Sequence, residues 1–356
     1  MTAGGRFADR RAAVRAWMAG ERADALLVSA EPNVRWLTGF TGEGLLVLEP
    51  DEELLCTDSR YAVQAGEEAP DVEFVAEGGH LDGAIERINA TGAGRVGFGS
   101  NHLCYADYER LVEALVGVEL LPLEDRIRQL RAIKDAAEVA LIRRAAEVAD
   151  AAFTELRPQI EPGLSERAAA EELRRLMVLG GAEKPSFDII FAAGPNGAKP
   201  HARPGERVVA AGDLIVIDWG AVVDGYCSDC TRTVIVGEPD ERRREVWLAV
   251  RRAQIAAMEG LRPGMEGREV DAIARESLCE AGYAEYFGHG LGHGVGLEVH
   301  ELPTVGKKSE NTLEPGMVVT IEPGVYIEDW GGVRLEELVL VTEEGAEALT
   351  AAPYDL

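Results

Sequence analysis

The sequence is poor in positive charge, since 36 Lys and Arg residues stand against 63 Asp and Glu residues and give a formal net charge of −27. A surface of this sign repels phosphate backbones and anionic lipids, which argues against nucleic-acid binding and a role at a membrane surface. No apolar run reaches the roughly 18 residues that a membrane-spanning helix needs. The N-terminal stretch MTAGGRFADRRAAVRAWMAG carries charges but lacks the apolar core of a secretory signal. We therefore predict a cytoplasmic protein with no nucleic-acid or membrane partner.

Cysteine is also scarce, with five residues in a chain of 356. An odd number in a chain of this length argues against a disulfide framework and favours a reducing compartment. Cys227 and Cys230 form a lone CxxC pair in a strand-like stretch, where residues three apart face opposite sides. Because no second pair accompanies them, we predict two ordinary buried thiols rather than a zinc or redox site.

The chain is longer than one hydrophobic core normally serves, so we predict two domains, residues 1–125 and 126–356. In the first domain, strand-like runs such as ADALLVSA, EGLLVLEP and EELLCTDS accompany helical spacing near residues 8–20, 81–90 and 105–116. This order predicts a small α/β domain in which antiparallel strands precede β-α-β units.

A stretch with helical spacing from Leu123 to Phe153 crosses the domain boundary and predicts one long helix. An internal repeat follows: IEPGLSERAAAEEL resembles LRPGMEGREVDAIA, and AGDLIVIDWG resembles PGMVVTIEPG without a gap. Several matches in the same order indicate a duplicated α+β unit folded about a pseudo-two-fold axis. The repeat superimposes three pairs of polar side chains: Asp218 on Glu322, Asp229 on Glu336, and His201 on His300.

Two acids of the first copy lie in strand-like, apolar surroundings. The dipeptide Asp224-Gly225 is a strong signal for a tight hairpin turn. A two-residue turn there places Asp218 opposite Thr231, with Asp229 on the diagonal of the same face. Carboxylates at that spacing can share cations between them.

In the second copy, Glu322 ends an apolar strand, and Glu336 begins another beyond a turn predicted at Gly331-Gly332. Four acids in apolar strands are costly to bury without counter-charge, and these strands hold too few arginines to balance them. We therefore predict a metal site with mostly oxygen ligands, which favours Mn²⁺ and allows Co²⁺, Fe²⁺ or Zn²⁺ because a histidine takes part. Four acids exceed what one catalytic ion needs, so two divalent ions are expected.

The stretch GHGLGHGVGLEVHE, residues 288–301, holds His289, His293 and His300 among five glycines. Glycine lets the backbone pass close to a crowded centre. The stretch lacks the Gly-Lys-Ser/Thr ending of a phosphate-binding loop, and the chain lacks an HExxH zinc helix. We interpret one of these histidines as a nitrogen ligand and the others as groups that meet the substrate.

The local motifs IDWG, GYCSDCTRT, HGLGHGVGLEVHE, TIEPGVY and VRLEE together resemble those of the pita-bread metallopeptidases, over about residues 126–350. PNVRWLTGFTG and TDSRYAVQA resemble the creatinase-type N-terminal domain of the proline-specific branch, which includes Xaa-Pro aminopeptidases and prolidases. The resemblance implies an α+β pita-bread catalytic domain after a smaller α/β domain with a ribonuclease-H-like fold.

The resemblance also implies a role for each polar residue. Asp229 and Glu336 would bridge both ions, and Glu322 would be a ligand and the shuttle for the proton of the attacking water. His289, His300 and His201 would contact the substrate, the first two also the developing oxyanion. Arg334 would support the last glutamate and help to bind substrate. The five implied metal ligands are Asp218, Asp229, His293, Glu322 and Glu336.

The first hypothesis for function is an Xaa-Pro aminopeptidase, in which a hydroxide bridging two ions attacks the bond between the N-terminal residue and a following proline. The alternative is an Xaa-Pro dipeptidase (prolidase), which must also bind the free carboxylate of its dipeptide; Arg35 and Arg60 are candidates. A non-catalytic peptide-binding member of the family is disfavoured because all five ligands are present. Proline-containing peptides are the expected substrates, and the resemblance implies a homodimer.

Overall fold

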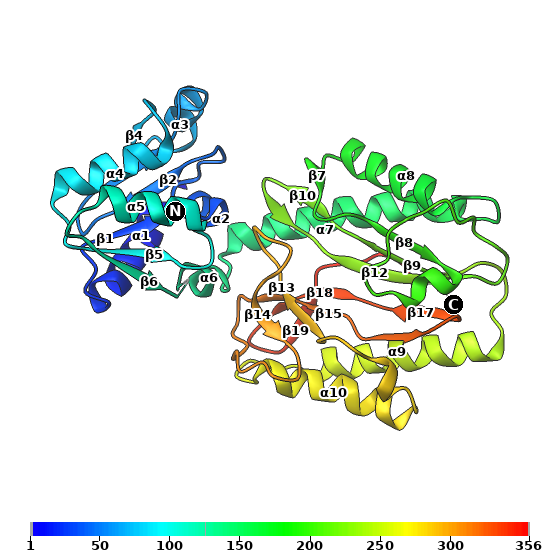
Figure 1. Ribbon diagram of the computed structural model, residues 1–356. Coiled ribbons are helices and arrows are strands. Elements are labelled where there is room, and N and C mark those ends of the chain that lie inside the picture. The colour runs from blue at the N-terminus through cyan, green and yellow to red at the C-terminus, as the bar shows by residue number, and fades with distance from the viewer. Residues whose placement is uncertain (1–2, 125, 355–356) are drawn as a thin grey trace. The chain divides into compact units, whose positions relative to one another are not determined.

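The computed structural model of the chain describes residues 3–124 and 126–354 (Figure 1). The chain divides into two compact units between Arg131 and Ala132, a few residues after the boundary predicted from the sequence. Within the described residues, no helix is both long and apolar enough to cross a membrane.

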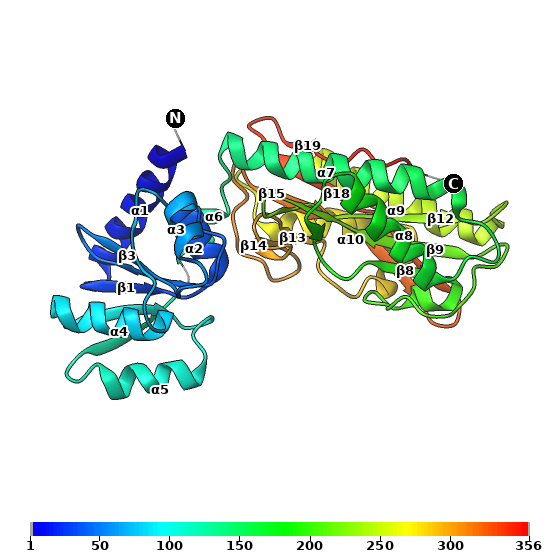
Figure 2. The same cartoon turned by 90° about the horizontal axis from the view of Figure 1, so that it is seen from above.

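The first unit is built on a six-stranded sheet with the strand order β4-β3-β2-β1-β5-β6. Strands β1 to β3 pair antiparallel, whereas β4, β5 and β6 each join the sheet in parallel. Figure 2 shows α4 and α5 on one face of this sheet and α1 on the other. The strands are β1 (Ala25–Val28), β2 (Leu45–Leu48), β3 (Glu53–Cys56), β4 (Glu73–Val75), β5 (Arg95–Gly99) and β6 (Glu119–Leu123). The helices are α1 (Ala3–Gly20), α2 (Glu31–Thr38), α3 (Ala62–Glu68), α4 (His80–Thr91), α5 (Tyr105–Ala114) and α6 (Arg126–Arg131).

The single helix predicted between Leu123 and Phe153 is wrong, because α6 ends at Arg131 and a new helix, α7, spans Ala136–Leu156. Asp135 begins α7 as its N-cap, and its side chain accepts hydrogen bonds from the first turn in a capping box with Glu138. An aspartate in this position stops helix propagation from the preceding residues. Helical spacing alone did not reveal this interruption.

The second unit consists of two similar halves. Figure 1 shows its strands lying between the pair α7 and α8 on one side and the pair α9 and α10 on the other. The further helices are α8 (Glu166–Leu179), α9 (Glu241–Gly260) and α10 (Gly267–Glu280), with short 3-10 turns η1 (Arg157–Gln159), η2 (Gly194–Ala198) and η3 (Ala284–Tyr286). Each repeated Pro-Gly leads into the second helix of its half, as the internal repeat predicts.

Two main sheets carry the site. One has the order β12-β9-β8, and the other has the order β14-β13-β15-β18-β19. Their strands are β8 (Ile190–Ala193), β9 (Leu214–Trp219), β12 (Cys230–Ile235), β13 (Gly292–Gly294), β14 (Glu301–Val305), β15 (Val318–Ile321), β18 (Glu337–Val341) and β19 (Ala346–Ala348). A small sheet has the order β11-β10-β7, formed by β7 (Lys184–Pro185), β10 (Ala221–Val223) and β11 (Tyr226–Cys227). A separate two-stranded sheet pairs β16 (Gly324–Ile327) with β17 (Gly331–Arg334).

Each half packs its helices on its own strands. In the first half, the ring of Trp219 in β9 stacks on Phe153 of α7 with 4.4 Å between centroids, and its indole nitrogen donates to the carbonyl of Ala149 at 2.9 Å. In the second half, Val270 and Leu278 of α10 pack in one core with Val319 of β15. These cores fix the strands from which the acidic side chains project.

The predicted hairpin of the first half is confirmed. Val223 pairs with Tyr226, so the turn has two residues, and both of them adopt the positive φ of a tight hairpin turn (Asp224 44°, Gly225 73°). Asp218 pairs with Thr231 in the predicted register.

The turn predicted at Gly331-Gly332 is wrong, because Ile327 pairs with Gly331 and both glycines belong to β17. The turn lies before them, at residues 328–330. Gly332 is needed for a different reason: a Cβ atom there would lie 2.1 Å from the carbonyl oxygen of Gly197 in η2. These glycines therefore allow β17 to pass close to the loop of the other half.

Candidate metal centre

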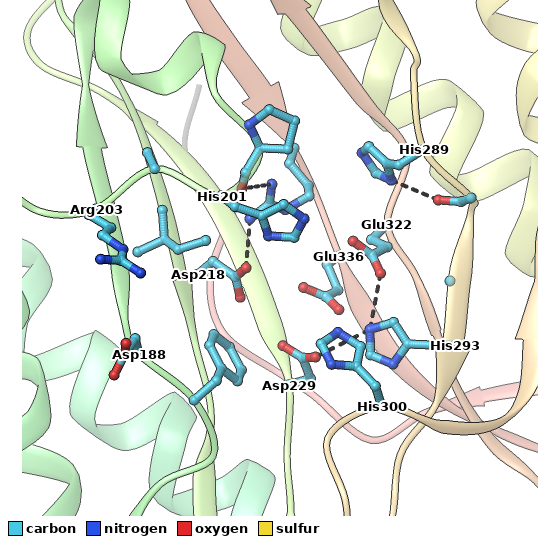
Figure 3. A pocket seen from close by; sticks show the side chains of 17 residues that line it. Asp188, His201, Arg203, Asp218, Asp229, His289, His293, His300, Glu322 and Glu336 are labelled. Carbon is cyan, nitrogen blue, oxygen red and sulfur yellow. Dashed lines mark hydrogen bonds and ion pairs between the residues drawn. The ribbon is translucent and has the colours of Figure 1, made fainter. Parts of the chain in front are cut away.

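Apart from Arg35 and Arg60, which belong to the first unit, every site residue that the sequence singled out lines one pocket of about 390 Å³ in the second unit (Figure 3). Four of them are carboxylates, four are histidines and one is an arginine. The pocket is lined by Asp218, Asp229, Glu322, Glu336, His201, His289, His293, His300 and Arg334. Residues as far apart along the chain as His201 and Glu336 thus meet at one place.

The four acids arrive from equivalent strand ends of the two halves. Asp218 is the penultimate residue of β9, and Asp229 directly precedes β12. Glu322 follows β15, and Glu336 directly precedes β18. The main chain joins the halves here, because the amide of Glu336 donates to the carbonyl of Thr231 at 3.0 Å.

Asp229 and Glu336 are almost completely buried, at 4% and 1% exposure. Burial, followed by the charge of Glu336, raises the pKa of Asp229 well above its usual range. Burial and the charge of Glu322 raise the pKa of Glu336 in the same way. Like charges held this close in a desolvated pocket need a counter-charge.

The pocket also leaves carboxylate oxygens without partners. Among the described residues that line the pocket, three carboxylates each have one buried oxygen without a hydrogen-bond partner: Asp218 Oδ1, Asp229 Oδ1 and Glu336 Oε1. Unpaired buried oxygens are costly, and cations satisfy them. The donor set therefore fits divalent metal ions.

His293 supplies a nitrogen to this set. Its Nδ1 lies 3.2 Å from the carbonyl of Gly294, which assigns the ring proton to Nδ1 and leaves the Nε2 lone pair facing the acids. Nε2 lies 3.3 Å from Glu322 Oε1 and 3.6 Å from Asp229 Oδ2. Asp229, His293 and Glu336 each offer one ligand atom within 4.8 Å of the others. The carboxylates of Asp218 and Glu322 line the pocket around this group.

Arg334 is almost completely buried, and its guanidinium is fully engaged. It donates to Asp218 Oδ2 at 2.6 Å, to Thr231 Oγ1 at 3.0 Å, to the hydroxyl of Tyr326 at 2.9 Å and to the carbonyl of Pro200 at 3.1 Å. These contacts orient Asp218. A direct contact of Arg334 with substrate stays a prediction.

Both ring nitrogens of His289 have partners. Nδ1 lies 2.7 Å from the carbonyl of Gly290, and Nε2 lies 3.0 Å from the hydroxyl of Tyr326. Burial lowers the pKa of His289, so the ring is neutral, donates from Nδ1 and accepts at Nε2. Arg275 donates to the His289 carbonyl and pairs with Asp271, which holds this loop in place. His289 thus forms a fixed wall of the pocket.

His201 and His300 are exposed at the mouth of the same pocket. Among the described residues, their ring nitrogens have no hydrogen-bond partner. Burial, followed by the charge of His293, lowers the pKa of His300, whose ring centroid lies 4.2 Å from that of His293. Both side chains face the pocket, and their contact with a substrate stays a prediction.

Other residues of the site were not predicted from the sequence. Tyr326 stands four positions after Glu322, inside the motif TIEPGVY, so its position in that motif was the available signal. The wall on the Asp218 side also lacked a sequence signal; it consists of Phe187, Asp188, Ile190 and Arg203. Only the pairing of Ile190 with Asp218 in the folded sheet reveals this neighbourhood.

The predicted burial of Cys227 and Cys230 is confirmed, and both carry free thiols. Burial raises the pKa of Cys227 to about 11, which keeps its sulfur protonated. Both cysteines lie in the buried interior on either side of Asp229.

Comparison with known proteins agrees with this geometry. Residues 10–133 match the creatinase/prolidase N-terminal domain, and residues 140–343 match metallopeptidase family M24. The Xaa-Pro dipeptidase of Pyrococcus furiosus is 40% identical over 337 residues, which cover 94% of this chain and 95% of that protein.

Solved structures give the same result. The Xaa-Pro dipeptidase of Bacillus anthracis superimposes with a TM-score of 0.95 at 39% identity, over 98% of this chain and 99% of that chain. The X-Pro aminopeptidase of Thermotoga maritima superimposes with a TM-score of 0.90 at 35% identity, over 97% and 99%. These matches confirm the predicted pita-bread fold and creatinase-type N-terminal domain. The chain belongs to metallopeptidase family M24 and is a peptidase of the hydrolase class.

Proposed function

We propose that the chain is an Xaa-Pro dipeptidase that hydrolyses the bond between an N-terminal residue and a C-terminal proline. The observation that carries the proposal is the group of four converging carboxylates around His293, with unpaired buried oxygens. The choice of substrate rests on the relatives, because Xaa-Pro dipeptidases match nearly the whole chain at about 40% identity. The comparisons thus favour the alternative over the aminopeptidase that the sequence analysis put first. The Thermotoga structure keeps an Xaa-Pro aminopeptidase as the second candidate.

The residues suited to hold two divalent ions are those that the sequence resemblance implied. Oxygen donors with a single imidazole favour Mn²⁺ among the common divalent ions. Bound ions of this kind polarise a carbonyl and lower the pKa of water. The proposed ligands are Asp218, Asp229, His293, Glu322 and Glu336.

The side chains of the pocket divide the remaining work. Glu322 Oε1 accepts a hydrogen bond from the hydroxyl of Thr320 at 3.1 Å, so we assign proton transfer to its Oε2. That oxygen would take a proton from the attacking water and pass it to the proline nitrogen. His300 is neutral and has no hydrogen-bond partner among the described residues, so it would donate to the carbonyl oxygen as that oxygen gains charge. His289 would hold the proline ring against a fixed wall, since both its nitrogens are already in use.

Proline gives a physical reason for a dedicated enzyme. A peptide nitrogen that belongs to proline has no N–H, and its φ is fixed near −65°. Peptidases that bind the N–H at the scissile bond cannot use that contact here. A pocket that recognises the proline ring and the flanking groups can bind such a substrate without that contact.

Hydrolysis by chelator-stripped protein, with and without added Mn²⁺, tests the proposal. The substrates are Ala-Pro, Ala-Pro-Ala and Met-Ala-Ser. We expect Mn²⁺-dependent cleavage of Ala-Pro in preference to Ala-Pro-Ala and no cleavage of Met-Ala-Ser. Preference for the tripeptide would make the protein an aminopeptidase. Cleavage of Met-Ala-Ser alone would refute the proline-specific assignment. The homodimer and the cytoplasmic location stay predictions from the sequence.

A further inference from the structure

One wall of the metal pocket has no role in the mechanism above. It lies on the Asp218 side of the pocket, across from His293, as Figure 3 shows. Ile190 of β8 pairs directly with Asp218 of β9, which places this wall beside the metal centre. Phe187 and Ile190 make it apolar, whereas Asp188 and Arg203 add one charge of each sign.

Arg203 differs from the other cationic groups of the pocket. The guanidinium of Arg334 already serves four partners, and the ring of His289 is held neutral between two. Arg203 is exposed, and no described residue gives its guanidinium a hydrogen bond or an ion pair. Asp188 lies in the same wall, is also exposed and forms no ion pair with it within the described residues. The pocket therefore holds an arginine that is free to bind an anion.

We propose that Arg203 binds a carboxylate of the substrate and thereby sets substrate preference; this inference rests on the proposed function. A guanidinium binds a carboxylate through two parallel hydrogen bonds, which fixes both position and orientation. In an Xaa-Pro dipeptide, the C-terminal carboxylate lies one residue from the scissile bond. An acidic first residue, as in Glu-Pro, carries a second carboxylate within similar reach.

Asp188 carries the opposite charge in the same wall, so its substitution tests the proposal in the opposite direction. A carboxylate in the same wall repels an incoming anion through a partly solvated medium. Asn at position 188 removes this repulsion and keeps a similar side-chain volume. Loss of positive charge at Arg203 should therefore weaken binding of the anionic substrate, and loss of negative charge at Asp188 should strengthen it.

Lys307 and Lys308 are the rival cations. They line a separate pocket of about 380 Å³ that shares His289 and Gly290 with the metal pocket. No carboxylate of the metal centre lines that second pocket, whereas Arg203 lines the same pocket as all four. The structure thus favours Arg203, and the two lysines provide a matched comparison.

The test measures binding by calorimetry on the Mn²⁺-loaded Glu322→Gln protein, in which turnover is suppressed, together with KM and kcat in the otherwise native enzyme. The ligands are Ala-Pro, its C-terminal amide, Glu-Pro and Gln-Pro. The variants are Arg203→Gln, Arg203→Lys, Asp188→Asn, and Lys307→Gln combined with Lys308→Gln.

We expect Arg203→Gln to lower the affinity for one of the carboxylate ligands about tenfold or more, because the substitution removes a charge-assisted hydrogen bond. The matched neutral ligand and kcat should stay nearly unchanged, Arg203→Lys should recover part of the affinity, and Asp188→Asn should raise affinity roughly twofold. A loss confined to Ala-Pro against its amide identifies the C-terminal carboxylate. A loss confined to Glu-Pro against Gln-Pro identifies the side chain of the first residue.

Equal affinities in Arg203→Gln and the parent protein would overturn the inference, as would a loss seen only in the double lysine variant. The proposed function fails separately, because it requires the native enzyme to cleave Ala-Pro. The calorimetric comparison does not depend on that cleavage.

Discussion

Thr231→Val is the substitution that best tests how the protein tunes its metal ligands. Thr231 is fully buried, and its hydroxyl donates to Glu336 Oε2 at 2.6 Å. The same hydroxyl oxygen accepts a hydrogen bond from Arg334 Nε at 3.0 Å. Valine has nearly the same shape but removes both hydrogen bonds. The substitution therefore leaves every proposed ligand in place and changes only the groups that orient Glu336 and Arg334.

The expected size follows from these two contacts. A hydrogen bond to a charged group contributes about 1.5–3 kcal/mol, and loss of the partner that orients a metal ligand typically weakens metal affinity about 10- to 100-fold. We expect a loss of that order for Thr231→Val. At a fixed excess of Mn²⁺, a tenfold weaker affinity lowers the stabilisation by metal by about 1.4 kcal/mol.

Titration of chelator-stripped protein with Mn²⁺, followed by calorimetry and by the metal-induced rise in Tm, measures this effect. Thr231→Ser is the matched control, because it keeps the hydroxyl and removes only the methyl group; its metal affinity should stay close to that of the native protein. Unchanged Mn²⁺ affinity in Thr231→Val would refute the reasoning that this hydroxyl holds Glu336 in its binding geometry.

Two further predictions concern stability and are checked by urea unfolding. Gly332→Ala should lower the free energy of unfolding by about 3 kcal/mol, because its Cβ would lie 2.1 Å from the Gly197 carbonyl oxygen. Gly288→Ala is the control: a Cβ there meets nothing within 4 Å, so stability should hardly change. Burial raises the pKa of Asp150 to about 6, so the folded state binds a proton more tightly than the unfolded state, and this contribution to stability is lost as the pH rises from about 4 through 6. Asp150→Asn should therefore be more stable than the native protein at pH 8, by about 1–2 kcal/mol after allowance for solvent screening. This gain in the free energy of unfolding should shrink towards pH 5. An equal gain at both pH values would contradict the reasoning.

The sequence predicted the acidic part of the site well, because strand patterning and tight turns are local signals. Apolar runs rich in β-branched residues identified the strands, and Asp224-Gly225 fixed the register that sets Asp218 opposite Thr231. The internal repeat then predicted the same arrangement for Glu322 and Glu336. Local pattern and fold agree wherever one hairpin decides the geometry.

Side chains that reach the pocket from more distant segments of the chain could not be predicted in this way. Arg203 reaches the pocket from the loop after η2, and Ile190 reaches it through pairing of β8 with β9. Gly331 and Gly332 looked like a turn, but they serve the close approach of two chain segments. Spacing along the chain reports how one element folds, whereas these positions depend on how distant elements pack.

The packing of the two halves has a consequence for metal binding. Arg334 of the second half orients Asp218 of the first, and Thr231 of the first half orients Glu336 of the second. Each half thus supplies acids that the other half holds in place, so neither could form the centre alone. Bound ions would draw the like charges of both halves to one point and stabilise their association by the free energy of binding. The two halves are therefore joined at the acidic pocket itself, and removal of metal should loosen that junction before it disturbs the separate cores around Trp219 and Val319.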